Sequence, residues 1–242
     1  MKWTFSFSLI ICVLFLFINT GNAQIKSGKI VYERKTNLYK KFKDKGMREW
    51  IKEEDKNKID YFELYFNDSI SVFKPQESDL KDDMNWTTSR NVVYQKQSAN
   101  YKLTIKKIWG EELYVEDTLT KREWKITDSK RTINNYNCRK AIWEANDSTR
   151  IYAWYCDEIS ASIGPESFYG LPGAIMGIAA EDGGVIYFAK SVEVLKSDVT
   201  TMIPKKGKNK IYTPAELKSK LQKDFGKYPW GKNMIKNAFD IW

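Results

Sequence analysis

Hydrophobic and polar positions alternate along much of this chain. Within 101–109, Tyr101, Leu103 and Ile105 alternate with lysine and threonine, which is the period-two pattern of a half-buried strand. Strand-like segments of this kind occur at 28–34, 59–66, 70–73, 91–95, 101–109, 112–115, 123–127, 136–143, 150–157 and 174–178. No helical pattern interleaves with them, so the order predicts a mainly β domain built as an antiparallel meander.

Two stretches depart from the strand pattern. Residues 39–58 are dense in charge, which is typical of an exposed loop or of a polar amphipathic helix. Near the end, Thr213 and Glu216 form a capping box around Pro214, and a helix follows with Leu217, Leu221 and Phe225 on one face. Gly226 is placed to end this helix. We expect the helix and the aromatic tail after it to pack against the sheet.

The N-terminus has the pattern of a secretory signal. Lys2 precedes an apolar run, Phe5–Ile18, and small residues stand at both positions that signal cleavage after Ala23 requires. The apolar run is too short to favour a membrane span. We therefore expect a signal peptide at 1–23 and a single β-rich domain at 24–242, exported to the periplasm or beyond the cell and soluble after cleavage.

Composition limits the chemistry that the chain can perform. It contains no histidine, which excludes Ser-His and Cys-His nucleophile pairs and imidazole metal sites. We expect no metal and no cofactor. The formal charge is +9, but the lysines are scattered except at 205–210. Scattered lysines indicate a solvated surface, so we expect no nucleic-acid partner.

Two cysteines follow the signal, in a predicted hairpin that turns at Asp147. Folding the chain about this residue places Cys138 opposite Cys156, and Glu144 opposite Arg150. Directly opposed strand residues lie within disulfide reach, and an exported protein meets oxidising conditions. We expect a structural disulfide. A redox-active pair is the alternative, but the spacing lacks a Cys-x-x-Cys motif.

The same register assigns side chains to the two faces of the hairpin. Lys140 falls opposite Trp154 and Arg139 opposite Tyr155, so that each cation can lie over a ring. Both faces carry rings, and the pattern leaves open which face is core.

A tight turn follows the hairpin at Leu171-Pro172-Gly173-Ala174. Proline at the second position and glycine at the third predict a type II turn. It either connects two segments or forms a stiff surface loop that contacts a ligand.

These motifs together resemble a known family. The resemblance is carried, in one order, by 124–127, Ile133, 136–141, 153–155, Ile159, Gly164-Pro165, Phe168 and Gly170-Leu171-Pro172-Gly173. It is to the GLPGLI family, secreted proteins of Bacteroidetes-type bacteria without an established activity. Ala174 stands where the name has its second leucine. The strand order is also similar to periplasmic lipoprotein carriers, which implies a curved antiparallel sheet or half-barrel able to hold an apolar ligand.

These features favour a non-enzymatic binding or accessory protein of the periplasm or outer-membrane region. Its partner would be an apolar ligand or an envelope protein complex, contacted by Lys140, Tyr152, Trp154, Phe168, Tyr169, Leu171 and Pro172. A carboxylate-dependent hydrolase of envelope glycans or peptides is the alternative, using Asp157, Glu158 or Glu166. A third hypothesis is a structural subunit that pairs through an exposed edge strand.

Overall fold

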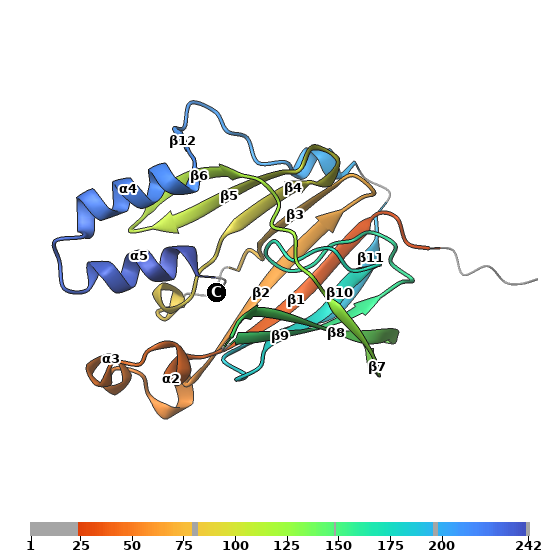
Figure 1. Cartoon of the computed structure of the whole chain (residues 1–242), viewed down its shortest axis with the longest axis horizontal. Helices are drawn as coiled ribbons and strands as arrows, with labels where there is room; N and C mark the ends of the chain where they lie inside the picture. The colour runs from red at the N-terminus through yellow and green to blue at the C-terminus, as the bar shows by residue number, and fades with distance from the viewer. Residues whose placement is uncertain (1–23, 79–81, 148, 196–197, 241–242) are drawn as a thin grey trace, which may run out of the picture.

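The computed structural model describes residues 24–242 except 79–81, 148, 196–197 and 241–242 (Figure 1). The predicted signal peptide lies outside the described residues. Twelve strands form one curled sheet. The first six are β1 (Gly28–Asn37), β2 (Asn57–Phe66), β3 (Ile70–Pro75), β4 (Val92–Lys96), β5 (Tyr101–Ile108) and β6 (Glu111–Asp117). The others are β7 (Lys125–Ile133), β8 (Tyr136–Asn146), β9 (Thr149–Cys156), β10 (Ala174–Ala180), β11 (Val185–Val194) and β12 (Ile211–Tyr212).

The sheet consists of two antiparallel meanders joined at one seam. Strands β1 to β6 pair in sequence order, as do β7 to β11, and the seam is the pairing of β1 with β11. The short β12 adds to β6 in parallel. The predicted meander is thus confirmed, whereas the prediction omitted β11, the strand that links its two halves.

Side-chain alternation explains which face of the sheet is buried. In β1, Ile30 and Tyr32 are buried while their neighbours are half-exposed, and β2 buries Phe62, Leu64 and Phe66 in the same way. Strand β10 is buried on both faces. Gly177 makes this possible, because a Cβ there would lie 2.8 Å from the ring of Phe188.

The α-helices lie in two places, in the segment after β1 and in the C-terminal part of the chain. In the charged segment after β1 lie α2 (Leu38–Lys41) and α3 (Lys45–Glu49), and the C-terminal part holds α4 (Pro214–Phe225) and α5 (Gly231–Phe239). Single 3₁₀ turns lie at Glu53–Asp55, Asn85–Thr87, Gln97–Ala99 and Val199–Met202. In the described part of the chain, no helix is long and apolar enough to span a membrane.

The C-terminal helix begins as the sequence predicts. Thr213 Oγ1 accepts from the Glu216 amide, and the Glu216 carboxylate accepts from the Thr213 amide at 2.7 Å. Leu217 and Leu221 pack on β6. Helix α5 was not predicted; it starts at a glycine and has no side-chain cap, so the usual start signals are missing.

The predicted disulfide is wrong: both cysteines are free and buried. The hairpin register is as predicted, since Arg139 pairs with Tyr155 and Glu144 with Arg150. The sulfurs turn to different partners, however. The Cys138 thiol donates to the Tyr136 carbonyl at 3.5 Å, while Cys156 faces the backbone amides that follow it, at 158 and 159.

The turn after the hairpin differs from the predicted type II turn. The Gly173 amide donates to the Leu171 carbonyl at 2.8 Å, which closes a three-residue turn around Pro172. The next amide, that of Ala174, donates to the Ile159 carbonyl at 3.0 Å, so the type II hydrogen bond is replaced by a contact with another segment. Gly173 has φ +147°, and a Cβ there would lie 2.1 Å from the Cys156 carbonyl oxygen. This position therefore requires glycine.

Candidate functional site

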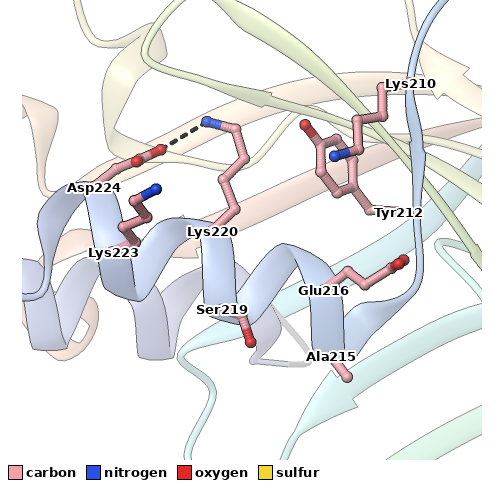
Figure 2. A pocket seen from close by; sticks show the side chains of 8 residues that line it. All are labelled: Lys210, Tyr212, Ala215, Glu216, Ser219, Lys220, Lys223 and Asp224. Carbon is pink, nitrogen blue, oxygen red and sulfur yellow. Dashed lines mark hydrogen bonds and ion pairs between the residues drawn. The ribbon is translucent and has the colours of Figure 1, made fainter.

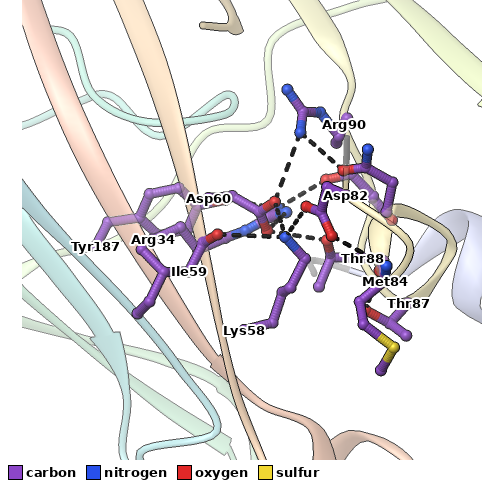
Figure 3. Close-up of polar contacts among 12 residues, drawn as sticks. Arg34, Lys58, Ile59, Asp60, Asp82, Met84, Thr87, Thr88, Arg90 and Tyr187 are labelled. Atoms are coloured by element: carbon purple, nitrogen blue, oxygen red, sulfur yellow. Dashed lines mark hydrogen bonds and ion pairs between the residues drawn. The ribbon is translucent and has the colours of Figure 1, made fainter. Parts of the chain in front are cut away.

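A buried ion pair lies at the inner face of the sheet, where β1 and β2 meet. Arg34 follows Ile30 and Tyr32 in the alternation of β1, and Asp60 precedes Phe62 in that of β2, so both charged side chains point inward. Arg34 Nη2 donates to Asp60 Oδ2 at 2.7 Å, as Figure 3 shows. Both side chains are almost fully buried.

Further donors surround the Asp60 carboxylate. Thr88 Oγ1 donates to Oδ2 at 2.9 Å, Lys58 Nζ lies 3.1 Å from Oδ1, and Arg90 lies 3.7 Å from it (Figure 3). Lys58 also pairs with Asp82. Burial acts to raise the pKa of Asp60, but the charge and hydrogen bond of Arg34, together with Lys58 and Thr88, lower it. The aspartate therefore stays ionised inside the protein.

Glu166 connects this ion pair to the loop before β10. Its backbone is left-handed, with φ 54°, and its side chain is buried. Tyr187 donates to Glu166 Oε1 at 2.9 Å, and Arg34 Nη1 lies 3.8 Å from the same atom. Burial raises the pKa of Glu166, against the opposing effects of Arg34, Tyr187 and Lys106. A carboxyl with a raised pKa holds its proton to higher pH than an exposed one, which is a property of many catalytic and ligand-binding acids.

A cavity of about 300 Å³ opens beside Glu166. Its walls come from β4, β5, β6 and β8, from the loops at 118–124 and 157–173, and from the C-terminal helices. The lining is Asn91, Val93, Lys102, Thr104, Lys106, Val115, Asp117, Thr120, Arg122, Trp143, Glu166, Ser167, Phe168, Pro214, Phe239 and Asp240. We take this cavity as the candidate binding site, because charged and aromatic side chains converge there from segments far apart in the sequence.

Arg122 lies between two rings at the wall of the cavity. Its Cζ is 4.3 Å from the centroid of Phe168 and 5.1 Å from that of Trp143. Its Nη1 donates to the carbonyls of Ser167, at 2.9 Å, and Thr120, at 3.3 Å. Burial lowers the pKa of Arg122 to about 10. Among the described residues, no carboxylate lies within ion-pair distance of this guanidinium, and its buried Nε has no acceptor.

The two cavity lysines differ in their partners. Lys102 pairs with Asp117 across β5 and β6, with 3.3 Å between Nζ and Oδ2. Lys106 is more enclosed: burial, helped by Lys102, lowers its pKa, while Glu166 acts in the opposite direction. No described carboxylate approaches Lys106 within ion-pair distance. The cavity thus contains two cations, Arg122 and Lys106, without a direct acidic partner.

A second hollow lies along α4, on the side that faces β12 (Figure 2). It is lined mainly by long polar side chains, and Lys220 pairs with Asp224 there at 2.7 Å. Most of these side chains are exposed. This hollow lacks the enclosed rings and buried charges of the first cavity.

The structure places the seven predicted contact residues in three locations. Lys140, Tyr152 and Trp154 lie on the face of β8 and β9 opposite the buried core, with Lys140 Nζ 4.0 Å from the Tyr152 ring centroid and 5.9 Å from that of Trp154. The predicted cation–ring stacking is confirmed for Lys140. Phe168 lines the cavity.

The remaining predicted positions surround the turn. Leu171 is buried in the core, Tyr169 is half-buried, and Pro172 is exposed. Of the three predicted acids, only Glu166 lines the cavity, while Asp157 is exposed and Glu158 is half-buried.

The prediction missed Arg34, Asp60, Lys106 and Arg122. A signal for the first two was present, because each charged residue occupies an inward position of an otherwise apolar alternation. Arg122 lies outside any regular strand, and only the folded chain brings it to Trp143 and Phe168.

Comparisons with known proteins identify a family over a short segment and a fold over most of the chain. The family model described as "Protein of unknown function (Porph_ging)" matches residues 143–177. No curated protein matches the chain.

Two solved structures of PNGF-II, in the P21 and C2 space groups, are similar to this chain at 17% identity, with TM-scores of 0.52 and 0.53. The matches cover 78% and 88% of this chain but 31% and 33% of the PNGF-II chains. This chain therefore spans about a third of their length, and the likeness shows the β-rich fold alone.

Proposed function

We propose that this protein is an exported, non-enzymatic binding protein that holds a small molecule in the cavity between strands β4–β6 and the C-terminal helices. The observation that carries the proposal is the enclosure of Trp143, Phe168 and the unpaired cations in one cavity. Rings and a few fixed polar groups are the usual lining of a ligand site. The resemblance to the GLPGLI family and the secretory signal pattern support an exported location.

Native mass spectrometry of the protein isolated from its own source tests this proposal. The expected result is a mass above that of the polypeptide, which disappears on denaturation. The variant Thr104→Phe should lose the bound species, because Thr104 lines the cavity and an added ring fills it. Lys107→Phe is the matched control, since Lys107 is an exposed position of the same strand. Retention of the ligand by a folded Thr104→Phe protein would contradict the proposed site.

Glu166 supports a second candidate, a carboxylate-dependent hydrolase of envelope glycans or peptides. This carboxyl reaches the cavity and has a raised pKa, as a general acid requires. Arg34 and Tyr187 also hold it in the ion-pair network, which suits a structural role. Hydrolysis of chromogenic glycosides or peptides that is lost in Glu166→Gln, and unaffected in Glu158→Gln, would favour the enzyme over the binding protein.

A further inference from the structure

We propose that the ligand of this cavity carries an oxyanion, a carboxylate or a phosphate, that binds Arg122 and Lys106 while its apolar part packs against Trp143 and Phe168. This inference rests on the proposed binding function and names the chemical class of the ligand.

The first argument is the unused hydrogen-bonding capacity of Arg122. A guanidinium presents five donors in a planar fork, and one edge is formed by Nε and Nη2. Here Nη1 is occupied by the carbonyls of Ser167 and Thr120, whereas neither Nε nor Nη2 donates to any described protein acceptor. A buried donor without a partner is costly, and an oxyanion is the acceptor that this fork binds best.

The second argument is the charge balance of the cavity. Asp117 is paired with Lys102 at 3.3 Å, and Glu166 is bound from its other side by Arg34 and Tyr187. The acids in the cavity wall thus already have cationic or hydroxyl groups nearby, and Asp240, just after α5, interacts with the charge of Lys41. Arg122 and Lys106 are left as the cations that a ligand would neutralise.

The third argument concerns the apolar part of the ligand. Trp143 and Phe168 meet edge to face, with 6.2 Å between their centroids, and both line the cavity beside Arg122. A rigid aromatic wall next to a cation favours a ligand with an oxyanion attached to a flat or cyclic apolar group. A purely apolar molecule would leave both cations desolvated and unpaired.

Titration of the whole protein with matched small probes tests the inference by ligand-observed NMR. Benzoate and phenyl phosphate carry the oxyanion, and benzamide is the neutral counterpart of benzoate. We expect benzoate or phenyl phosphate to bind at least tenfold more tightly than benzamide, with affinity falling as salt rises. The tighter of the two anions identifies the oxyanion as carboxylate or phosphate.

Two variants assign the binding to the cavity. Arg122→Gln and Lys106→Gln should each lower the affinity for the anionic probes by tenfold or more and leave the affinity for benzamide unchanged. Arg131→Gln is the control for the arginine, because Arg131 also stacks on two rings, Trp154 and Phe188, but on the outer face of the sheet. Lys107→Gln is the control for the lysine, since Lys107 is an exposed neighbour that pairs with Glu112.

The outcomes separate this inference from the proposed function. If benzamide binds as tightly as benzoate and Thr104→Phe abolishes both, the cavity is a binding site but the oxyanion preference is wrong. If the anions bind equally well to Arg122→Gln and to Arg131→Gln, the inference is overturned as well. If no probe binds and native mass spectrometry shows no ligand, both the inference and the proposed function fail.

Discussion

Arg34 and Asp60 are register partners in the β1–β2 ladder and form a buried ion pair, with 2.7 Å between Nη2 and Oδ2. Two inward charges in an apolar alternation would each destabilise the sheet alone. Together, and with Thr88 and Lys58 on the carboxylate, they form a hydrogen-bonded network that joins β1, β2 and the segment before β4. The specific pairing also opposes a one-residue slip of this ladder, which would turn one of the two charges to the other face.

Breaking this pair from one side should destabilise the protein strongly. We expect Arg34→Met and Asp60→Asn each to lower the free energy of unfolding by about 3–5 kcal/mol, because each leaves the opposite group without its buried partner. The double variant Arg34→Met/Asp60→Asn should lower the free energy of unfolding by less than the sum of the two single losses. Urea unfolding measures the free energy of unfolding of each variant. Arg150→Gln is the control, since its pairing with Glu144 is exposed and should contribute less than about 1 kcal/mol. Additive losses in the double variant would contradict the coupling.

Glu166 should make stability fall as pH rises. Its pKa in the folded protein is raised by burial, so between the unfolded pKa, about 4.3, and the folded pKa the native state binds more protons than the unfolded state. Stability therefore declines with pH through this window. Glu166→Gln removes the titration, so its free energy of unfolding should improve relative to wild type as pH rises above the unfolded pKa, as measured by urea unfolding at each pH.

Asp60 should make stability change with pH in the opposite direction. Its folded pKa is lowered, so its contribution to stability is present above the unfolded pKa and lost as pH falls through the folded value. Asp60→Asn should therefore differ from wild type most at neutral pH and least in acid. If the free energies of unfolding of Glu166→Gln and of wild type instead change with pH in parallel, the proposed titration of Glu166 is wrong.

The two buried thiols should resist modification in the native protein. Burial raises the pKa of Cys138 to about 12 and also raises that of Cys156, so little thiolate is present at pH 8. We expect residues 24–242 to take up no iodoacetamide when folded and two equivalents in denaturant without reductant, as read by mass spectrometry. Uptake only after reduction would show a disulfide instead.

Gly173 should tolerate no side chain. We expect Gly173→Ala to lower the free energy of unfolding by at least about 2 kcal/mol, because the new Cβ adds a backbone clash with Cys156 to the strain of a positive φ. Gly110→Ala separates the two effects: Gly110 has φ +82° but open space around it, so it should cost only about 1–2 kcal/mol. Equal losses in thermal or urea unfolding would mean that the close contact with Cys156 contributes nothing.

Local patterns in the sequence predicted the local parts of this fold. The hairpin register about Asp147 and the capping box at Thr213 depend on residues a few positions apart, and both are confirmed. The β1–β11 seam joins residues about 150 to 165 positions apart, and no local pattern specifies such a pairing. The disulfide prediction failed for a related reason, because opposed register alone does not decide where the sulfurs turn.

The candidate site was only partly predictable. Phe168 and Glu166 lie near the recognisable turn and were singled out, though in different hypotheses. Arg122 carries no periodic pattern, and its importance comes from the rings and carbonyls that surround it in three dimensions. Lys106 reads as an ordinary polar position of a half-buried strand until the C-terminal helices cover that face.

The seam between β1 and β11 also implies an order of assembly. Strand β1 can pair with β2 as soon as both have been synthesised, but its other edge stays open until the chain has been made as far as residue 194. Each meander is made of neighbours in sequence, so the two half-sheets form from local contacts and the seam closes last. A chain divided between β6 and β7 would yield two such half-sheets, and their reassociation would involve this ladder, the pairing of β12 with β6 and the packing of α4 on β6.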